Sequence, residues 1–574
     1  MTDWRDLLSS FDTVSLHKRE NGDFGNETLE TARRILRPDQ QVFEDGILFT
    51  DTSVLAEKFD VDQEEVVAVI EDYITSSARF GHKWILLDMS SESNRHYIDH
   101  DRSWRAYQRC LYDICKKNLW ETSVATNLMI EGGDDVIAVP KKVYHIMTDR
   151  FQAEVDLWYC FPPGVDVVDE MTHYVDVCDE FNPEALYENL VSCARFNVSR
   201  IPLPDGIIDD EFTLGNSLES YFTKALDSYS DPSVRNVCLA SAGEFKIASY
   251  IVSEGLPLCC RDGRFSARKV YLAPPVNVDR KLSHNLPDEY LRDLSAADCL
   301  FFNCHGDGVE VGDGIEDDTE SRYFSHQGDG PTLFDTHLPN PEYRNKLFLS
   351  CACFGARYLR YDKERSILLK TLYDSSTINF AGSSIVAKGG LNGAALSENF
   401  LRVFLDFIVR GYRVGEAFMR AKLAYLSYFL PVEMVIADMG LTINEFNLFG
   451  DPFCRYTAMG NWQLFSSSDN LLGVKMKKGP YPVESEIHSI VDAVYTATRD
   501  SVDSALNDIA ELLGRRIESD YSLRGVKHVG TETKTVNGRI DGYKFMYSYK
   551  CGRVGFIEAH TDTKGNTQRL IISK

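Results

Sequence analysis

The sequence lacks the marks of an exported or membrane-spanning protein. Its first residues, Met1–Asp6, contain neither the basic nor the apolar region of a secretory signal. No run of about 18 apolar residues is present that could cross a bilayer. The 14 cysteines form no Cys-x-x-Cys pair of the metal-binding type. These absences predict a cytoplasmic protein whose cysteines are reduced.

The sequence also has too few basic residues for a polyanion-binding protein. It has 61 Lys and Arg against 87 Asp and Glu, which gives a formal net charge of −26. A field of this sign repels phosphate backbones and anionic lipid surfaces, so we expect no direct nucleic-acid or membrane binding. The same charge favours cationic substrates or partners, although most of it is solvated surface.

Apolar strand-like runs alternate with amphipathic helices through most of the chain. This alternation predicts an α/β fold with a mostly parallel sheet covered by helices on both faces. A chain of 574 residues is too long to fold around a single hydrophobic core, so several domains are expected. We predict an N-terminal arm (1–44), a first α/β subdomain (45–240), a second α/β subdomain (241–458) and a small C-terminal α+β domain (459–574), the last with a helix over Glu484–Ile517 followed by antiparallel strands.

Two of the apolar runs end at reactive side chains. Leu300–Asp307 ends in Asn-Cys-His-Gly-Asp, and Lys346–Gly355 ends in Ser-Cys-Ala-Cys-Phe-Gly. In open α/β sheets, sites form at the carboxyl ends of strands. A His that takes the proton of a thiol generates a thiolate nucleophile near neutral pH. We therefore predict a catalytic pair, with His305 as the base and the backbone amides of Gly306 and Cys353 as the oxyanion donors.

Two cysteines compete for the role of nucleophile. Cys351 and Cys353 lie two positions apart, so both would point to the same side of an extended strand. Cys353 is nearer the strand end and is followed by Phe-Gly, which favours it. A single strand cysteine more often packs as a small hydrophobic residue. His305 nevertheless precedes Cys353 by 48 residues, and caspase-type sites have a spacing of about 50.

At these residues the chain resembles the gingipain-like cysteine peptidases of the caspase–hemoglobinase fold. The resemblance extends roughly over residues 45–455 and is strongest from 295 to 455. Besides the catalytic pair, the matching segments are Ile70–Asp88, Val198–Pro202, Thr377–Ser384, Gly411–Lys422 with Gly-Glu-Ala and Ala-Lys, and Asn447–Pro452 with Asn-Leu-Phe-Gly-Asp-Pro.

The resemblance implies two side-by-side caspase-like α/β subdomains, with the catalytic pair in the second and a supporting half in the first. It also implies substrate-binding residues. Val155–Tyr159 is similar to the segment that carries the specificity carboxylate of arginine-specific members, so Asp156 is a candidate partner for a basic P1 side chain. A solvated or helix-capping role is the more ordinary one for such an Asp. Ser383, in the Gly-Ser turn, is the other substrate-binding candidate.

Together these patterns predict a cytoplasmic cysteine endopeptidase that forms a thioester acyl-enzyme with specific protein substrates. Without a secretion signal it would have to be held latent until a regulatory protein or ligand acts on the C-terminal domain or on the acidic loop Asp307–Glu320. No cofactor is expected. Calcium at that loop is an alternative, although the loop lacks the EF-hand pattern. Two alternatives remain open: a caspase-like pseudo-enzyme that serves as a partner-binding scaffold, and an enzyme that uses the same pair for acyl transfer or amide hydrolysis on a non-peptide substrate.

Overall fold

The structure is a computed structural model. It describes residues 45–118, 127–146, 149–165, 193–205, 212–234, 237–242, 269–272, 288–307, 322–324, 332–339, 342–359, 362–390, 396–409, 411–429, 436–456, the C-terminal strands within 524–573, and isolated residues between 173 and 252. The predicted N-terminal arm and the predicted helix Glu484–Ile517 lie outside the described residues.

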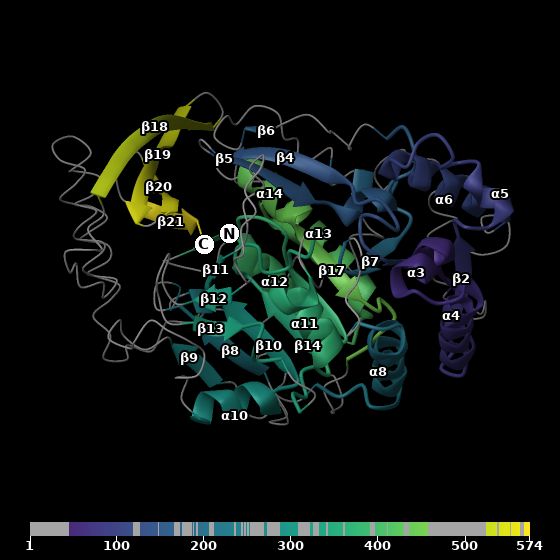
Figure 1. Cartoon of the computed structure of the whole chain (residues 1–574). Helices are drawn as coiled ribbons and strands as arrows, with labels where there is room; N and C mark the ends of the chain where they lie inside the picture. The colour runs from purple at the N-terminus through teal and green to yellow at the C-terminus, as the bar shows by residue number, and fades with distance from the viewer. Residues whose placement is uncertain are drawn as a thin grey trace, which may run out of the picture.

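One ten-stranded sheet forms the body of the molecule (Figure 1). Every neighbouring pair in it is parallel except β17 and β15, which are antiparallel. The predicted α/β class with a mostly parallel sheet is therefore confirmed. In spatial order the strands are β2 (Lys83–Asp88), β1 (Asp45–Thr50), β3 (Asn127–Glu131), β7 (Asn197–Ile201), β17 (Phe446–Gly450), β15 (Asn379–Ser383), β14 (Leu347–Ser350), β10 (Cys299–Asn303), β8 (Val237–Ser241) and β9 (Lys269–Leu272).

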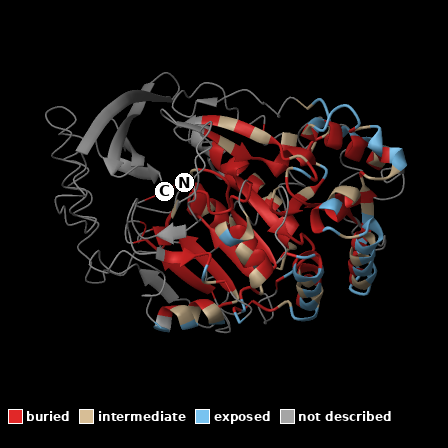
Figure 2. Ribbon diagram, viewed as in Figure 1, coloured by how far each residue is buried: buried red, intermediate tan, exposed pale blue. Residues whose placement is uncertain are grey.

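Helices cover the sheet, as predicted from the alternating pattern. Strands β17, β15, β14 and β10 are buried at every residue, so both of their faces are covered. Figure 2 shows this buried interior, with exposed residues gathered on the outer helices such as α4 and α8. The main helices are α3 (Thr52–Phe59), α4 (Gln63–Ala78), α6 (Trp104–Asn118), α8 (Ser220–Ser230), α10 (Asp288–Ala296), α11 (Ile367–Asp374), α12 (Leu396–Val409), α13 (Val414–Phe429) and α14 (Ile436–Glu445).

The sheet consists of two halves whose strands run in opposite directions. The antiparallel register pairs Ser383, at the end of β15, with Phe446, at the start of β17. Strand β17 is also parallel to β7, with Phe449 beside Arg200. The carboxyl ends of β8, β10, β14 and β15 therefore share one edge of the sheet, and those of β1, β2, β3 and β7 share the opposite edge.

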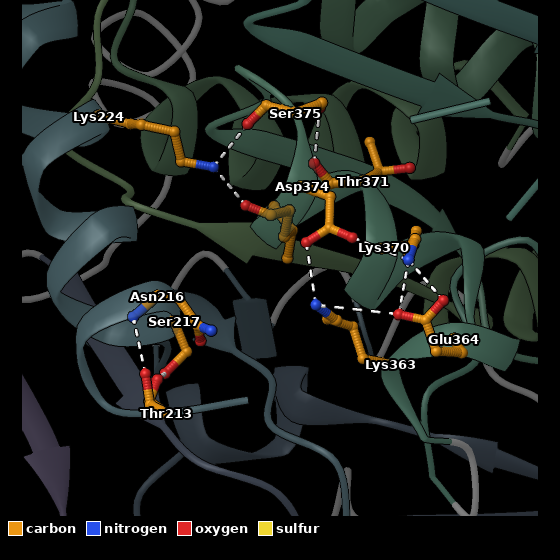
Figure 3. A network of polar contacts seen from close by, with 11 residues as sticks. Thr213, Asn216, Ser217, Lys224, Lys363, Glu364, Lys370, Thr371, Asp374 and Ser375 are labelled. Atoms are coloured by element: carbon orange, nitrogen blue, oxygen red, sulfur yellow. Dashed lines mark hydrogen bonds and ion pairs between the residues drawn. The ribbon is translucent and has the colours of Figure 1, made fainter. Parts of the chain in front are cut away.

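Buried polar groups tie the two halves together. Asp451, just after β17, accepts a hydrogen bond from the Tyr73 hydroxyl of α4 at 2.7 Å and another from Tyr229 of α8. The Nζ of Lys224 on α8 donates to the carbonyl oxygen of Ser375, after α11, at 2.7 Å (Figure 3). Burial lowers the pKa of Lys224 to about 7. These contacts join elements from the first 240 residues to elements after residue 366.

Three smaller sheets accompany the large one. β4 (Lys141–Ile146), β5 (Asp149–Glu154) and β6 (His173–Tyr174) form the first, and β11 (His305–Asp307), β12 (Arg322–Phe324) and β13 (Thr332–Asp335) form the second. The third contains the predicted C-terminal strands β18 (Arg524–Val536), β19 (Arg539–Cys551), β20 (Arg553–Asp562) and β21 (Thr567–Ser573), joined to β16 (Lys388–Gly390). They are longer than the apolar segments that predict them, which are His528–Lys534, Tyr543–Tyr549, Val554–His560 and Leu570–Ile572.

Within the part of the chain that the structure describes, no helix has the length and apolar character needed to traverse a membrane.

Candidate active site

The two predicted strand ends are neighbours in the large sheet. β10 pairs in parallel with β14, and the register sets Phe302 beside Ser350. The backbone N–H of Cys351 continues this ladder by donating to the carbonyl oxygen of Phe302 at 2.8 Å. His305 follows β10 and Cys353 follows β14, so both leave the sheet at the same carboxyl edge. This is the edge at which an α/β sheet forms its sites.

Gly306 brings the two segments into direct contact. A Cβ atom added to Gly306 would lie 1.9 Å from the carbonyl oxygen of Cys353 and 3.0 Å from the Cβ of Ala352. Only glycine permits this approach between the two main chains. The residue next to the imidazole is thus packed against the backbone of the residue that carries the thiol.

If His305 and Cys353 form the predicted catalytic pair, Gly306→Ala lowers peptide cleavage by at least about 100-fold, since a displacement of about 1 Å in a catalytic group has an effect of that size. The added methyl group must push the Cys353 carbonyl, which belongs to backbone and cannot rotate away. Turnover of a cleaved peptide and thermal unfolding would be measured together. Gly215→Ala is the control, because its new Cβ would meet no atom nearer than 3.5 Å. Unchanged cleavage by Gly306→Ala would show that the close contact between Gly306 and the Cys353 backbone is not needed for catalysis.

The turn after Cys353 has a strained backbone. Phe354 adopts a φ of 54°, in the left-handed region that aromatic residues rarely occupy. Its N–H donates to the carbonyl oxygen of Ile385 at 2.8 Å, and its ring contacts that of Phe151 on β5 with centroids 6.1 Å apart. Strain of this kind persists only where the surroundings enforce it, and such positions cluster at functional sites.

The strand before this turn is shorter than the sequence predicted. We expected it to extend through Cys353, but β14 ends at Ser350. The turn from Ala352 to Ala356 takes over, and the N–H of Gly355 donates to the carbonyl oxygen of Ala352 at 3.2 Å. The alternation argument that set Cys351 and Cys353 on one side of a strand therefore does not apply. Cys353 lies within the turn, whereas Cys351 lies before it.

The imidazole and the thiol are both covered by protein. His305 has no exposed surface and Cys353 is 1% exposed. The thiol Sγ lies 3.5 Å from the carbonyl oxygen of Ala387, to which it donates. The ring of His305 packs against Phe245 with centroids 5.1 Å apart. A substrate could reach the thiol only if part of the protein that covers Cys353 moved away.

Ser383 belongs to the support of the turn. Its carbonyl oxygen accepts a hydrogen bond from the N–H of Ala356 at 2.8 Å, which ties the turn that contains Cys353 to the end of β15. Its hydroxyl donates to the carbonyl oxygen of Ile385 at 2.9 Å and is fully buried. The structure thus brings Ser383 close to Cys353, with the hydroxyl in a backbone turn. A direct contact with substrate stays a prediction.

Asp156 is paired with an arginine of its own chain. The Nε of Arg200 donates to Asp156 Oδ2 at 2.8 Å, and Nη2 donates to Oδ1 at 2.6 Å. The two side chains are 0% and 5% exposed. From the sequence we expected a solvated, helix-capping or substrate-binding role for this Asp, and not a buried ion pair. Its partner Arg200 lies in the segment Val198–Pro202.

The structure contains a charged cavity of about 160 Å³ that no sequence pattern predicted. It is lined by Asp134, Lys141, Gln152, Glu154, Asp205, Arg357 and Leu359. Arg357 lies four residues after Cys353, and its guanidinium group lies 5.7 Å from the centroid of the Phe354 ring. Burial raises the pKa of Glu154 to about 8. These residues come from separate segments, so no sequence pattern unites them.

Beyond Asp307, the acidic loop expected to receive a regulator or calcium lies outside the described residues. Among the residues that the structure does describe, no group of three or more His, Cys, Asp or Glu side chains is arranged to hold a metal ion.

Comparison with known proteins gives remote structural likenesses. No family model matches the chain. No curated protein matches it either. One solved structure, described as a protease, is 11% identical with a TM-score of 0.45, and the match covers 92% of this chain and 96% of the other. The Arg-specific cysteine proteinase gingipain R is 9% identical with a TM-score of 0.45, covering 91% and 96%. Likenesses this remote carry no argument about activity, so the function is argued from the residues.

Proposed function

We propose that the protein is a cysteine endopeptidase with Cys353 as nucleophile and His305 as general base. The observation that supports this most strongly is the contact between Gly306 and the backbone of Cys353, at the carboxyl ends of neighbouring parallel strands. The strained Phe354 beside the thiol is a second support. A purely structural cysteine needs neither feature.

In the proposed reaction, His305 accepts the thiol proton and the thiolate attacks the scissile carbonyl carbon. A C–S bond forms, and the carbonyl electrons move to oxygen, where the N–H groups of Gly306 and Cys353 stabilise the negative charge. Collapse of this intermediate breaks the C–N bond, and the leaving amine takes the proton from His305. Water then hydrolyses the thioester and regenerates the thiol.

Protein substrates, rather than small amides, suit this site because an extended polypeptide can add to a strand edge. The site would have to open first, because His305 and Cys353 are buried. A basic P1 residue would need a carboxylate. Since Arg200 already occupies both oxygens of Asp156, Glu154 in the charged cavity is the alternative partner. A bound P1 cation would lower the pKa of Glu154, which burial raises to about 8, and so favour the carboxylate form. Cleavage after Arg or Lys that is lost in Glu154→Gln would support that carboxylate, and loss in Asp156→Asn alone would support the original assignment.

The alternative is a caspase-like scaffold that binds partners without cleaving them. The complete burial of His305 and Cys353 is the observation that favours it. A scaffold has no need for a reactive thiol, so the two functions differ in a measurable property.

We expect the full chain to cleave a positional peptide library and to lose this activity after alkylation with an iodoacetamide-type reagent. The protein would be used in excess over the peptides, because a small open fraction then still registers. Mass spectrometry of the products distinguishes hydrolysis from acyl transfer, and candidate protein substrates from neighbouring genes extend the test. Cleavage that survives complete alkylation of Cys353 would refute the proposed nucleophile. No cleavage, with Cys353 alkylated as slowly as the buried Cys299, would favour the scaffold.

A further inference from the structure

A short strand lies immediately beside the thiol and outside the large sheet. β16, Lys388–Gly390, begins one residue after Ala387, whose carbonyl oxygen faces the Cys353 Sγ. The carbonyl oxygens of the preceding residues Ser383 and Ile385 accept hydrogen bonds from the turn that contains Cys353. β16 therefore begins next to the residue whose carbonyl oxygen contacts the Cys353 sulfur. An exposed strand edge is a surface on which a peptide can add as a further strand.

One side of β16 is fixed by helix α12. The Ser397 hydroxyl donates to the carbonyl oxygen of Lys388 at 2.7 Å, and the Gly390 N–H donates to the Glu398 carboxylate at 3.2 Å. Backbone groups of successive strand residues point to opposite sides. The N–H and C=O of Gly389, between these two residues, therefore face away from α12 and are directed to the remaining edge.

The C-terminal strand of the same chain lies on this remaining edge. β21 pairs antiparallel with β16, and the register sets Lys388 beside Ser573, Gly389 beside Ile572, and Gly390 beside Ile571. Through this pairing β16 is the edge strand of a five-stranded sheet otherwise built from residues after 523. In the view of Figure 1, β21 is drawn near the label of β11.

We propose that β21 occupies the edge on which the main chain of a substrate binds, so that the C-terminal sheet is a built-in competitive inhibitor. This inference rests on the proposed peptidase function and identifies how the same site is regulated. A substrate peptide pairing with β16 would need the backbone groups of Gly389, which now face Ile572. The burial of Cys353, at 1% exposure, is the state expected of a covered site.

The inhibitory strand is covalently linked to the site. It therefore competes with a substrate as an intramolecular ligand, at an effective concentration set by the length and stiffness of the connection and independent of the protein concentration. The activating event is then any interaction that binds the C-terminal sheet better when β21 has left β16, since only differential affinity shifts such an equilibrium. The partner expected is a protein that pairs with the strands of this sheet.

The test removes the backbone N–H donor at the centre of the pairing between β16 and β21. In the full chain, Ile572→Pro removes the N–H of the residue opposite Gly389, because proline has no backbone donor. We expect Cys353 to be alkylated at least about tenfold faster, as the open fraction rises. Hydrogen exchange of the segment containing 388–390 should also accelerate. Ile572→Ala is the matched control, because it keeps the backbone N–H and should behave as the original chain does.

A peptide added in trans provides the second measurement. The sequence Thr567–Lys574 should slow the alkylation of Ile572→Pro, and the same peptide carrying the proline should not. This result holds even if the substituted C-terminal sheet fails to fold, because the peptide then restores the missing strand. Equal alkylation rates in the original chain and Ile572→Pro, or no effect of the peptide, would overturn the proposal.

The same experiment separates the two proposals. Faster alkylation of Ile572→Pro without any cleavage of the peptide library would support the covered site and refute the peptidase. Cleavage that is equally fast in the original chain and in Ile572→Pro would support the peptidase and refute the inhibitory strand.

Discussion

Cys353→Ala is expected to abolish peptide cleavage, with kcat/KM falling by at least about 10⁴-fold, since removal of a covalent nucleophile has effects of this size. In the proposed mechanism, Cys353 is the one described side chain that attacks the scissile carbonyl carbon. The backbone amides of Gly306 and Cys353 survive the substitution, so binding is retained while the chemistry is lost. Single-turnover cleavage of a library peptide is the measurement.

Cys351→Ala is the matched control. The two thiols lie two residues apart and are both buried, at 0% and 1% exposure. Removing either one leaves a small cavity, with a similar cost in stability. Only Cys353 lies in the strained turn, so only its loss should remove cleavage. If Cys351→Ala abolished cleavage while Cys353→Ala retained it, the assignment of the nucleophile would be reversed.

Asp156→Ala should reduce the free energy of unfolding by about 3–5 kcal/mol, because it leaves the buried guanidinium of Arg200 without its anion. Arg200 has no exposed surface and donates to both Asp156 oxygens. Its Nη1 also donates to the carbonyl oxygens of Gly132 and Ile137 at 3.0 Å. Urea denaturation at neutral pH, followed by circular dichroism, measures the loss.

The double variant Asp156→Ala, Arg200→Met separates the ion pair from a substrate role. It removes the stranded charge, so we expect it to be more stable than Asp156→Ala alone. Two carbonyl oxygens still lose a donor, which keeps it below the original chain. If Asp156→Ala were as stable as the original and lost only cleavage after basic residues, the carboxylate would be a specificity determinant.

Local patterns predicted several elements of the fold well. The apolar runs Lys83–Asp88 and Cys299–Asn303 predict strands, and the structure has strands with these bounds. The helical pattern of Asp288–Ala296 predicts a helix, which has the same bounds in the structure. These segments have a clear periodicity, and tertiary packing reinforces it. The end of β14 was wrong by three residues, because Cys351–Cys353 continue the apolar run while the backbone already turns.

The site could be predicted only where it is local in sequence. His305 and Cys353 each terminate an apolar run, so their adjacency follows from the rule that sites form at strand ends. The pairing of Asp156 with Arg200, 44 residues away, follows no pattern of that kind. The docking of Ile572 beside Gly389 depends on a register between segments about 180 residues apart, which composition and periodicity do not encode.

The reversal of strand direction at β15 and β17 has a consequence for communication within the molecule. The strands that end at Asp88 and Glu131 present their carboxyl ends to the edge opposite Cys353. A molecule bound at that far edge would be separated from the thiol by the length of the strands. Any signal between the two edges must pass along the five-residue ladder Asn379–Ser383 or through the groups that bridge the halves, such as Asp451 and Lys224. Substitutions at these bridging residues are the ones able to uncouple the two ends of the protein without touching either.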